Sequence, residues 1–231
     1  MNKFLSIIPA RIGSKGIPKK NLYPLSGKPL IQWTIESSLS SKYISNTVIS
    51  SNSDEVLNLA SLFGATPHKR NELLSNDVAR SEAVVKNVLE ELEYLQNDFD
   101  YLILLQPTSP LRTFKHIDYA CKKIIESQCD SLISVKETPN GILKTLIENG
   151  QGGLKTGFNK DFPFMPRQEL PKAYMPNGAI YISKISSFIK TGSFMSTKNT
   201  FIVMDDFSSQ DIDTIEDLNT VEGFLKSSES D

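Results

Sequence analysis

The sequence predicts an α/β protein built on a doubly wound, mostly parallel sheet. Strand and helix patterns alternate over the first half of the chain, which is typical of this class. The run 101–105 is apolar at every position, as expected for a central strand that helices cover on both faces. Hydrophobic residues make up 39% of the chain, enough for a core of this kind. The ligand of such a sheet is expected beyond the carboxyl ends of its strands.

Each element has its own signal. The first strand is the apolar run 4–8, which Pro9 ends because proline cannot donate to a sheet ladder. Pro29 suits the first turn of a helix that continues to Leu39 at helical spacing. A strand at 47–50 precedes a helix with Asp54 as its cap and Gly64 as its stop. The later elements are expected as helices at 82–95, 115–127, 185–189 and 215–226 and strands at 101–105, 131–135, 179–182 and 200–204. Thr214 and Asp217 fit a capping box for the last helix.

One segment breaks the alternation. Residues 137–176 are rich in glycine and proline and show little periodicity. The segment is therefore either a loose insertion or a part that a partner orders. We expect a catalytic domain at 1–136 and 177–231 with this segment inserted as an arm.

Bulk properties exclude several classes of protein. With 25 basic and 27 acidic residues the net charge is −2, so no overall basic field recruits nucleic acid. Cys121 and Cys129 form neither a metal motif nor a disulfide framework and fit free thiols in a reducing cytoplasm. The first apolar run is cut by Pro9 and Arg11, which argues against a secretory signal, and no stretch suits a membrane span.

The loop after the first strand combines cations with small residues. Arg11, Lys15, Lys19 and Lys20 are interleaved with the residues Gly13, Ser14 and Gly16. Small residues let a ligand approach backbone N–H groups, and the cations suit a polyphosphate. A solvated surface turn is the alternative. The spacing is not that of a Walker loop, because Leu22 and Pro29 stand where glycine and Ser/Thr belong.

Two further stretches could carry chemistry. The segment Gln-Pro-Thr-Ser-Pro-Leu-Arg at 106–112 follows the central strand and offers polar side chains at its carboxyl end, although it could be only a rigid turn. In Asp211-Ile212-Asp213 alternate residues face the same way, so both carboxylates could bind one Mg²⁺. Alternatively, Asp213 only caps the last helix. The adjacent pair 205–206 is a weaker candidate.

These stretches together resemble the cytidylyltransferases that activate acidic sugars, above all the CMP-sialic acid synthetases. The resemblance runs from Ile8 to Leu218, with the motifs in the family's order. It implies a Rossmann-like nucleotidyltransferase fold, CTP and an acidic 2-keto sugar as substrates, Mg²⁺ as cofactor, and a homodimer with 137–176 as its dimerisation arm.

The resemblance also implies roles for individual residues. The implied catalytic residues are Arg11, Lys20 and Asp211, and the implied metal ligands are Asp211 and Asp213. The implied nucleotide-binding residues are Arg11, Ser14, Lys15, Lys20, Asn21, Arg70, Ser81 and the mobile Lys144. The implied sugar-binding residues are Gln106, Thr108, Arg167 and Asn177.

Three residues depart from the family pattern. Asn52 stands in place of an acid, Asn71 in place of a proline, and Met175 in place of an arginine found in the closest sialic-acid enzymes. The Met175 difference leaves the sugar open. We expect a sialic-acid-type nonulosonic acid, with legionaminic acid, pseudaminic acid or the eight-carbon Kdo as alternatives. A non-catalytic nucleotide-binding module and a glycosyltransferase are the rivals from other classes, and the number of cations in the first loop argues against the latter.

Overall fold

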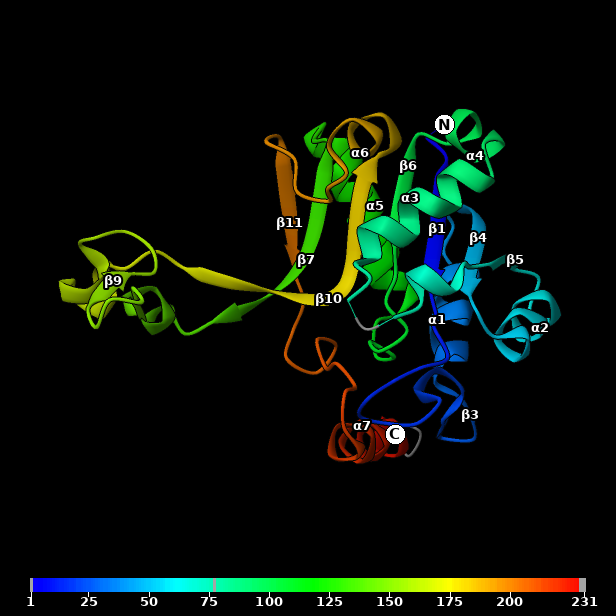
Figure 1. Cartoon of the computed structure of the whole chain (residues 1–231), viewed down its shortest axis with the longest axis horizontal. Coiled ribbons are helices and arrows are strands. Elements are labelled where there is room, and N and C mark those ends of the chain that lie inside the picture. Colours follow the sequence, from blue (N-terminus) through cyan, green and yellow to red (C-terminus); the bar gives the residue numbers. More distant parts are fainter. Residues whose placement is uncertain (1, 77, 229–231) are drawn as a thin grey trace.

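The computed structural model describes residues 2–76 and 78–228. Seven strands within these ranges form one sheet, in the order β11-β7-β10-β6-β1-β4-β5 (Figure 1). Its strands are β1 (Phe4–Pro9), β4 (Ile44–Ser51), β5 (Thr66–Lys69), β6 (Tyr101–Leu104), β7 (Ser131–Thr138), β10 (Ala173–Lys184) and β11 (Asn199–Val203). Only β10 runs antiparallel to its neighbours in this sheet. The predicted mostly parallel sheet is therefore confirmed.

The structure contains seven α-helices in its described residues, of which all but the last, α7, cover the two faces of the sheet. They are α1 (Leu30–Leu39), α2 (Asp54–Leu62), α3 (Ser81–Glu91), α4 (Tyr94–Asp98), α5 (Phe114–Ser127), α6 (Ile185–Thr191) and α7 (Ile215–Ser228). Alternate residues of β1 point to opposite faces. Phe4 and Ile8 belong to the cluster with α1, α2 and α5, whereas Leu5 and Ile7 pack with α3 and α6. The doubly wound arrangement thus follows from an apolar strand that buries both of its faces.

Two local predictions were wrong, and one strand was not predicted. The helix expected at 82–95 ends at Glu91, because Leu92 leaves helical conformation, and α4 then follows. The apolar spacing that suggested one helix reflects burial, since Leu95 still joins the core. The strand β5 was missed because its Thr-Pro-His-Lys sequence lacks apolar alternation; Pro67 is tolerated because β5 lies at the sheet edge. Ser53 is the residue that precedes α2, so Asp54 begins this helix and does not cap it.

The irregular segment projects from the sheet as a long ribbon (Figure 1). The ends of β7 and β10 carry it, and it holds a small hairpin of β8 (Leu146–Glu148) and β9 (Leu154–Thr156). Its exposed apolar side chains are Ile142, Leu146, Ile147, Leu154, Phe158 and Phe164. Among the described residues, the three main apolar clusters contain no residue from 139–172.

A third apolar cluster lies beneath the loops at the carboxyl ends of the strands. The short hairpin of β2 (Pro24–Leu25) and β3 (Lys28–Pro29) packs there with α7. The cluster contains Ile17, Leu111 and Ile212, one from each of the three motifs found in the sequence. These motifs therefore share one apolar base. No described helix has the length and apolar composition needed to cross a bilayer.

His68 ties the edge strand β5 to α3 and predicts a pH dependence of stability. Its Nδ1 lies 3.0 Å from Ser50 Oγ, and its Nε2 lies 3.0 Å from Glu91 Oε2. Burial lowers the pKa of His68, although Glu91 opposes the shift. The unfolded chain takes up a proton near pH 6.5 while the folded protein resists it, so the free energy of unfolding should fall as pH drops below about 6.5.

Replacing His68 by glutamine should flatten this decrease. The measurement is the free energy of unfolding of both proteins by urea denaturation between pH 7.5 and pH 5. His116, whose pKa burial also lowers, should supply what pH dependence remains in this range. Curves for wild type and His68→Gln that stay parallel over the whole range would contradict the prediction.

Candidate active site

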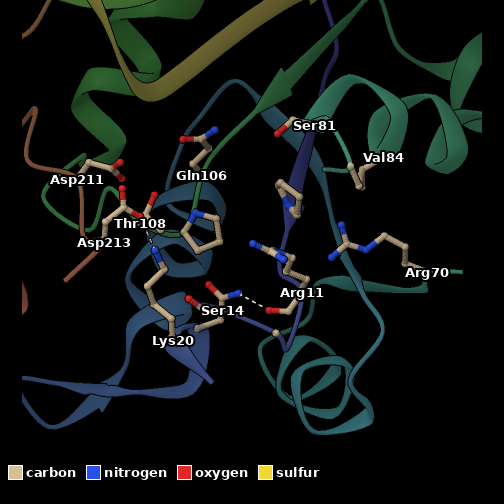
Figure 2. A pocket seen from close by; sticks show the side chains of 15 residues that line it. Arg11, Ser14, Lys20, Arg70, Ser81, Val84, Gln106, Thr108, Asp211 and Asp213 are labelled. Atoms are coloured by element: carbon tan, nitrogen blue, oxygen red, sulfur yellow. Dashed lines mark hydrogen bonds and ion pairs between the residues drawn. The ribbon is translucent and has the colours of Figure 1, made fainter. Parts of the chain in front are cut away.

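The carboxyl ends of the parallel strands open into a cavity of about 260 Å³. Three segments far apart in the sequence form most of its wall: the loop after β1, the loop after β6, and the segment before α7. Its lining residues include Arg11, Ser14, Lys20, Asn21, Arg70, Ser81, Gln106, Thr108, Asp211 and Asp213. Sequence reasoning named each of these as a site residue, and the fold brings them together (Figure 2).

The loop after β1 is held by its own polar contacts. The Asn21 amide donates to the carbonyl of Arg11 over 2.8 Å, and the N–H of Ile12 donates to Asn52 Oδ1 over 3.1 Å. Asn52 also donates to the Glu72 carboxylate. A carboxylate at position 52 could not donate this hydrogen bond to Glu72, which explains structurally why asparagine stands there. Asn71, the second departure, accepts a bond from the N–H of Leu73.

The adjacent lysines Lys19 and Lys20 point to different places. The Lys19 ammonium pairs with Glu55 on the exposed surface. Lys20 donates to the carbonyl of Ile212 over 2.7 Å and to Asp213 Oδ1 over 2.8 Å. Only Lys20 therefore lines the cavity. Lys15 lies beside it, in an adjoining cavity of about 380 Å³.

Cationic side chains cross the cavity from Arg70 through Arg11 to Lys20 (Figure 2). Arg70 is only 4% exposed, and its Nε and Nη2 have no hydrogen-bond partner among the described residues. Burial, with a further contribution from the Arg11 charge, lowers the pKa of Arg70 to about 10. Two like charges gathered at a concave surface favour an anionic ligand, because that ligand relieves their repulsion.

The carboxylates of Asp211 and Asp213 lie next to Lys20 (Figure 2). The cavity wall partly desolvates Asp211 and raises the pKa of its carboxyl. A hydrogen bond from Thr108 opposes this shift, and the Asp213 charge adds to it. Asp213 bonds to Lys20, while Thr214 and Asp217 make the predicted capping box of α7. The alternative reading of Asp213 as a mere helix cap therefore finds no support in these contacts.

The acidic pair suits a hard cation. Magnesium takes oxygen ligands and commonly combines one or two carboxylates with substrate phosphates and water. Among the described residues, no group of three or more His, Cys, Asp and Glu side chains could form a complete protein cage. Two carboxylates facing a cationic cavity fit a cation that arrives with a phosphate ligand.

A second cavity of about 250 Å³ adjoins the first and shares Ser81 and Gln106 with it. Its other lining residues are Glu82, Leu104, Ile133, Tyr181, Ser193, Phe194 and Met195. Sequence reasoning missed these residues. Tyr181 was only part of an apolar strand pattern, and the loop after α6 that carries Phe194 shows no periodic pattern. Gly178 allows the Gln106 amide to approach, because a Cβ there would lie 2.7 Å from Gln106 Oε1.

Arg112, which the motif 106–112 led us to expect as a donor at the ligand edge of the sheet, is instead buried and braces the loop after β6 from behind. Its guanidinium is fully buried and donates from Nη2 to Thr34 Oγ1 over 2.8 Å and to the carbonyl of Gln106 over 3.2 Å. Burial lowers the pKa of Arg112 to about 9. A buried cation bonded to the carbonyl of Gln106 fixes the loop that presents the Gln106 and Thr108 side chains.

Three predicted site residues do not line these cavities. Lys144 and Arg167 lie in the projecting ribbon, in short turns at Asn140–Lys144 and Arg167–Glu169. Asn177 is buried; it accepts a bond from Ser134 Oγ and donates to Ser209 Oγ. Their substrate contacts stay predictions. Met175 is 40% exposed at the base of the ribbon and lines neither cavity.

Solved structures share this fold. A structure of CMP:2-keto-3-deoxy-manno-octonic acid synthetase complexed with CTP matches 98% of this chain and 100% of its own, with a TM-score of 0.71 and 15% identity. A 4-diphosphocytidyl-2C-methyl-D-erythritol synthase from Anaerococcus prevotii matches 97% of this chain and 99% of its own, with a TM-score of 0.68 and 11% identity. At such identities the likeness establishes the fold.

Relatives found by sequence comparison have a higher identity to this chain than these two structures do. The pseudaminic acid cytidylyltransferase of Campylobacter jejuni is 35% identical over 92% of both chains. The CMP-N,N'-diacetyllegionaminic acid synthase of Legionella pneumophila is 32% identical over 92% of this chain and 91% of its own. The N-acylneuraminate cytidylyltransferase of Escherichia coli is 33% identical, and this chain spans 49% of its length.

A family model described as cytidylyltransferase matches residues 5–152. This range contains the cationic loop after β1 and the loop after β6, which form two of the three main walls of the cavity. Together with the full-length relatives and the fold, the match shows that the chain belongs to the cytidylyltransferase family and is a nucleotidyltransferase.

Proposed function

We propose that this enzyme activates a nonulosonic acid, a nine-carbon acidic 2-keto sugar, to its CMP-sugar with CTP as the donor. The anomeric hydroxyl oxygen of the sugar forms a bond to the α-phosphorus of CTP. The bond from that phosphorus to the bridging oxygen breaks, and pyrophosphate leaves. The observation that carries the proposal is one cavity with three cations facing an acidic pair, adjoined by a second cavity of sugar size.

The cations would bind the triphosphate and the charge that develops on it. Arg11, Lys20 and Lys15 would hold the phosphates, with Ser14 donating from the same loop. Arg70, Asn21 and Ser81 would contact the cytidine. Preorganised donors of this kind act most strongly where negative charge increases in the transition state.

Asp211 and Asp213 would hold a magnesium ion, which supplies charge neutralisation on the phosphate oxygens when bound. Asp211 would accept the proton of the sugar hydroxyl; its raised pKa and its position beside Thr108 at the cavity wall support this role. A raised pKa makes a carboxylate a stronger base near neutral pH.

The second cavity would take the distal part of the sugar. Gln106, at the junction of the two cavities, would hydrogen-bond the sugar, and Phe194 with Met195 would pack against its substituents. The two relatives that match this chain over nearly their whole length are named for pseudaminic acid and legionaminic acid. The longer relative from Escherichia coli is named for N-acylneuraminate. Kdo, with eight carbons and no acylamino group, would leave part of this cavity empty.

A panel of acceptors tests the choice of sugar. The measurement is kcat/KM for pyrophosphate release with CTP and N-acetylneuraminic, pseudaminic, legionaminic or Kdo acceptors. At least one nine-carbon acid should exceed Kdo about tenfold or more, which corresponds to about 1.4 kcal/mol. Kdo as the best acceptor would contradict the proposed class of sugar. No pyrophosphate with any acceptor would favour the non-catalytic nucleotide-binding module.

We further propose that the enzyme is a homodimer held by residues 137–176. Seven large apolar side chains in this segment are exposed, and the three main apolar clusters of the subunit contain none of the six that lie between 142 and 164. Lys144 and Arg167 lie on the same ribbon, so a partner's cavity is where they would meet substrate. The free thiols Cys121 and Cys129 support the proposed location in a reducing cytoplasm.

Charged substitutions on the ribbon should dissociate this dimer. Phe158 and Phe164 are 55% and 87% exposed, so aspartate there should not disturb the core of the subunit. The double variant Phe158→Asp/Phe164→Asp should sediment as a monomer and lose most turnover, while Leu62→Asp, at a 79% exposed leucine of α2, should stay a dimer. A wild-type protein that sediments as a monomer at micromolar concentration and is active would contradict the proposal.

A further inference from the structure

The backbone of Asp213 is fixed on its N–H side by Asp217. The Asp217 Oδ2 atom accepts hydrogen bonds from the N–H of Asp213 over 3.0 Å, the N–H of Thr214 over 2.8 Å and Thr214 Oγ1 over 2.9 Å. Charge-assisted bonds to a carboxylate are among the strongest in proteins. Asp217 therefore does more than cap α7: one of its three bonds holds the residue proposed as a magnesium ligand.

The carbonyl group of Asp213 lies directly against Gly16 of the cationic loop. A Cβ at Gly16 would lie 2.1 Å from the Asp213 carbonyl oxygen and 3.3 Å from its carbonyl carbon. The obstacle is backbone, which cannot swing aside as a flexible side chain can. By contrast, a Cβ at Gly13 in the same loop would meet no atom within 4 Å. Close approach therefore requires glycine at position 16 and not at position 13.

The residue before Asp213 is fixed as well. The N–H of Ile212 donates to the Thr108 carbonyl over 2.9 Å, its carbonyl accepts from Lys20, and its side chain is fully buried. The Asp213 side chain, in contrast, is 74% exposed. Its carboxylate is thus positioned through the main chain and the bond from Lys20, and not by packing around the side chain.

We infer that Gly16 and Asp217 are positioning residues that hold the Asp213 carboxylate in place for the metal, one from each side of its peptide unit. This inference rests on the proposed function, because Asp213 is a metal ligand only under that proposal. Under this inference, the loop proposed to bind the triphosphate and the helix α7 both orient the same metal ligand, Asp213. Loss of either contact should therefore weaken metal binding. Partners that orient metal ligands typically account for 10–100-fold in metal affinity.

Two pairs of matched variants test the inference. Gly16→Ala is compared with Gly13→Ala, and Asp217→Ala, which removes the acceptor oxygen, with Glu216→Gln, which removes a charge from an exposed neighbour in the first turn of α7. The first readout is the dissociation constant of Mn²⁺ for the protein with CTP bound and the sugar omitted, followed by electron paramagnetic resonance. The second is the Mg²⁺ concentration that gives half-maximal pyrophosphate release. Thermal melting of each apo protein controls for loss of fold.

Gly16→Ala and Asp217→Ala should each raise the Mn²⁺ dissociation constant about tenfold or more and shift the Mg²⁺ requirement in parallel. Gly13→Ala should keep the Mn²⁺ constant within about twofold, and Glu216→Gln should keep both readouts. Unchanged metal constants in both test variants of an active enzyme would overturn the inference, as would a CTP-bound wild type that binds no Mn²⁺. The proposed function itself fails instead if the wild type releases no pyrophosphate. Because the two test variants alter different elements, one that fails to fold leaves the other decisive.

Discussion

Replacing Asp211 by asparagine should lower turnover by about a hundredfold or more while leaving the fold intact. The substitution removes a negative charge from the acidic pair and the proposed proton acceptor at once. Losing one preorganised electrostatic group at a reacting centre typically costs 10²–10³ in kcat. Because the cavity raises the pKa of Asp211, ionising this carboxyl opposes folding at neutral pH. The melting temperature of Asp211→Asn should therefore stay the same or rise.

This combination of lost activity with unchanged or higher stability separates a functional carboxylate from a structural one. Asp213→Asn should raise the Mg²⁺ requirement with a smaller loss of turnover, since it keeps Asp211 as the proton acceptor. Asp206, which lines neither cavity, supplies the control: Asp206→Asn should behave as wild type. Magnesium titrations of pyrophosphate release decide the outcome. An unchanged Mg²⁺ dependence in both Asp211→Asn and Asp213→Asn would mean that the metal is held elsewhere.

Replacing Lys20 by alanine should also lower turnover by about a hundredfold, which corresponds to about 3 kcal/mol. The Lys20 ammonium faces the acidic pair and contacts Asp213 directly. Its removal takes a positive charge from the triphosphate site. The Ile212 carbonyl and the Asp213 carboxylate also lose the hydrogen bonds that Lys20 donates to them.

The neighbouring lysine supplies a matched control for this variant. Lys19 pairs with Glu55 on the surface, and exposed pairs of this kind contribute little to stability. Lys19→Ala should therefore keep turnover within about twofold. Steady-state kinetics with CTP varied would compare the two. Equal losses in both variants would show that the loop acts through its overall charge, and the specific role assigned to Lys20 would be wrong.

The architecture was predictable where local pattern and burial agree. The run 101–105 is apolar throughout because β6 is covered on both faces, and alternation of strands with helices gave the parallel sheet. Strand direction was not readable in the same way: β10 runs antiparallel because it returns from the projecting ribbon. Its length was also missed, since its first half pairs with β7 along the ribbon, where no core imposes an apolar pattern.

The site was predictable to the extent that its residues lie in compact motifs. The cationic loop, the segment 106–112 and the pair Asp211 and Asp213 each follow or precede a recognisable element, and the topology brings them to one edge. Tyr181 and Phe194 were missed, and Arg112 was expected to face a ligand and not to brace the loop, because these roles depend on neighbours from distant segments. The close contact of Gly16 with Asp213 likewise joins residues almost 200 positions apart, so no local pattern could reveal it.

The most direct test of the central claim is a mass balance of one reaction. Purified enzyme with CTP, Mg²⁺ and the preferred nonulosonic acid should release pyrophosphate and form CMP-sugar in equal amounts, both followed by mass spectrometry. The account predicts this one-to-one ratio and its loss when either the sugar or Mg²⁺ is omitted. Pyrophosphate that appears without the CMP-sugar, or a CMP-sugar yield that does not depend on Mg²⁺, would contradict it.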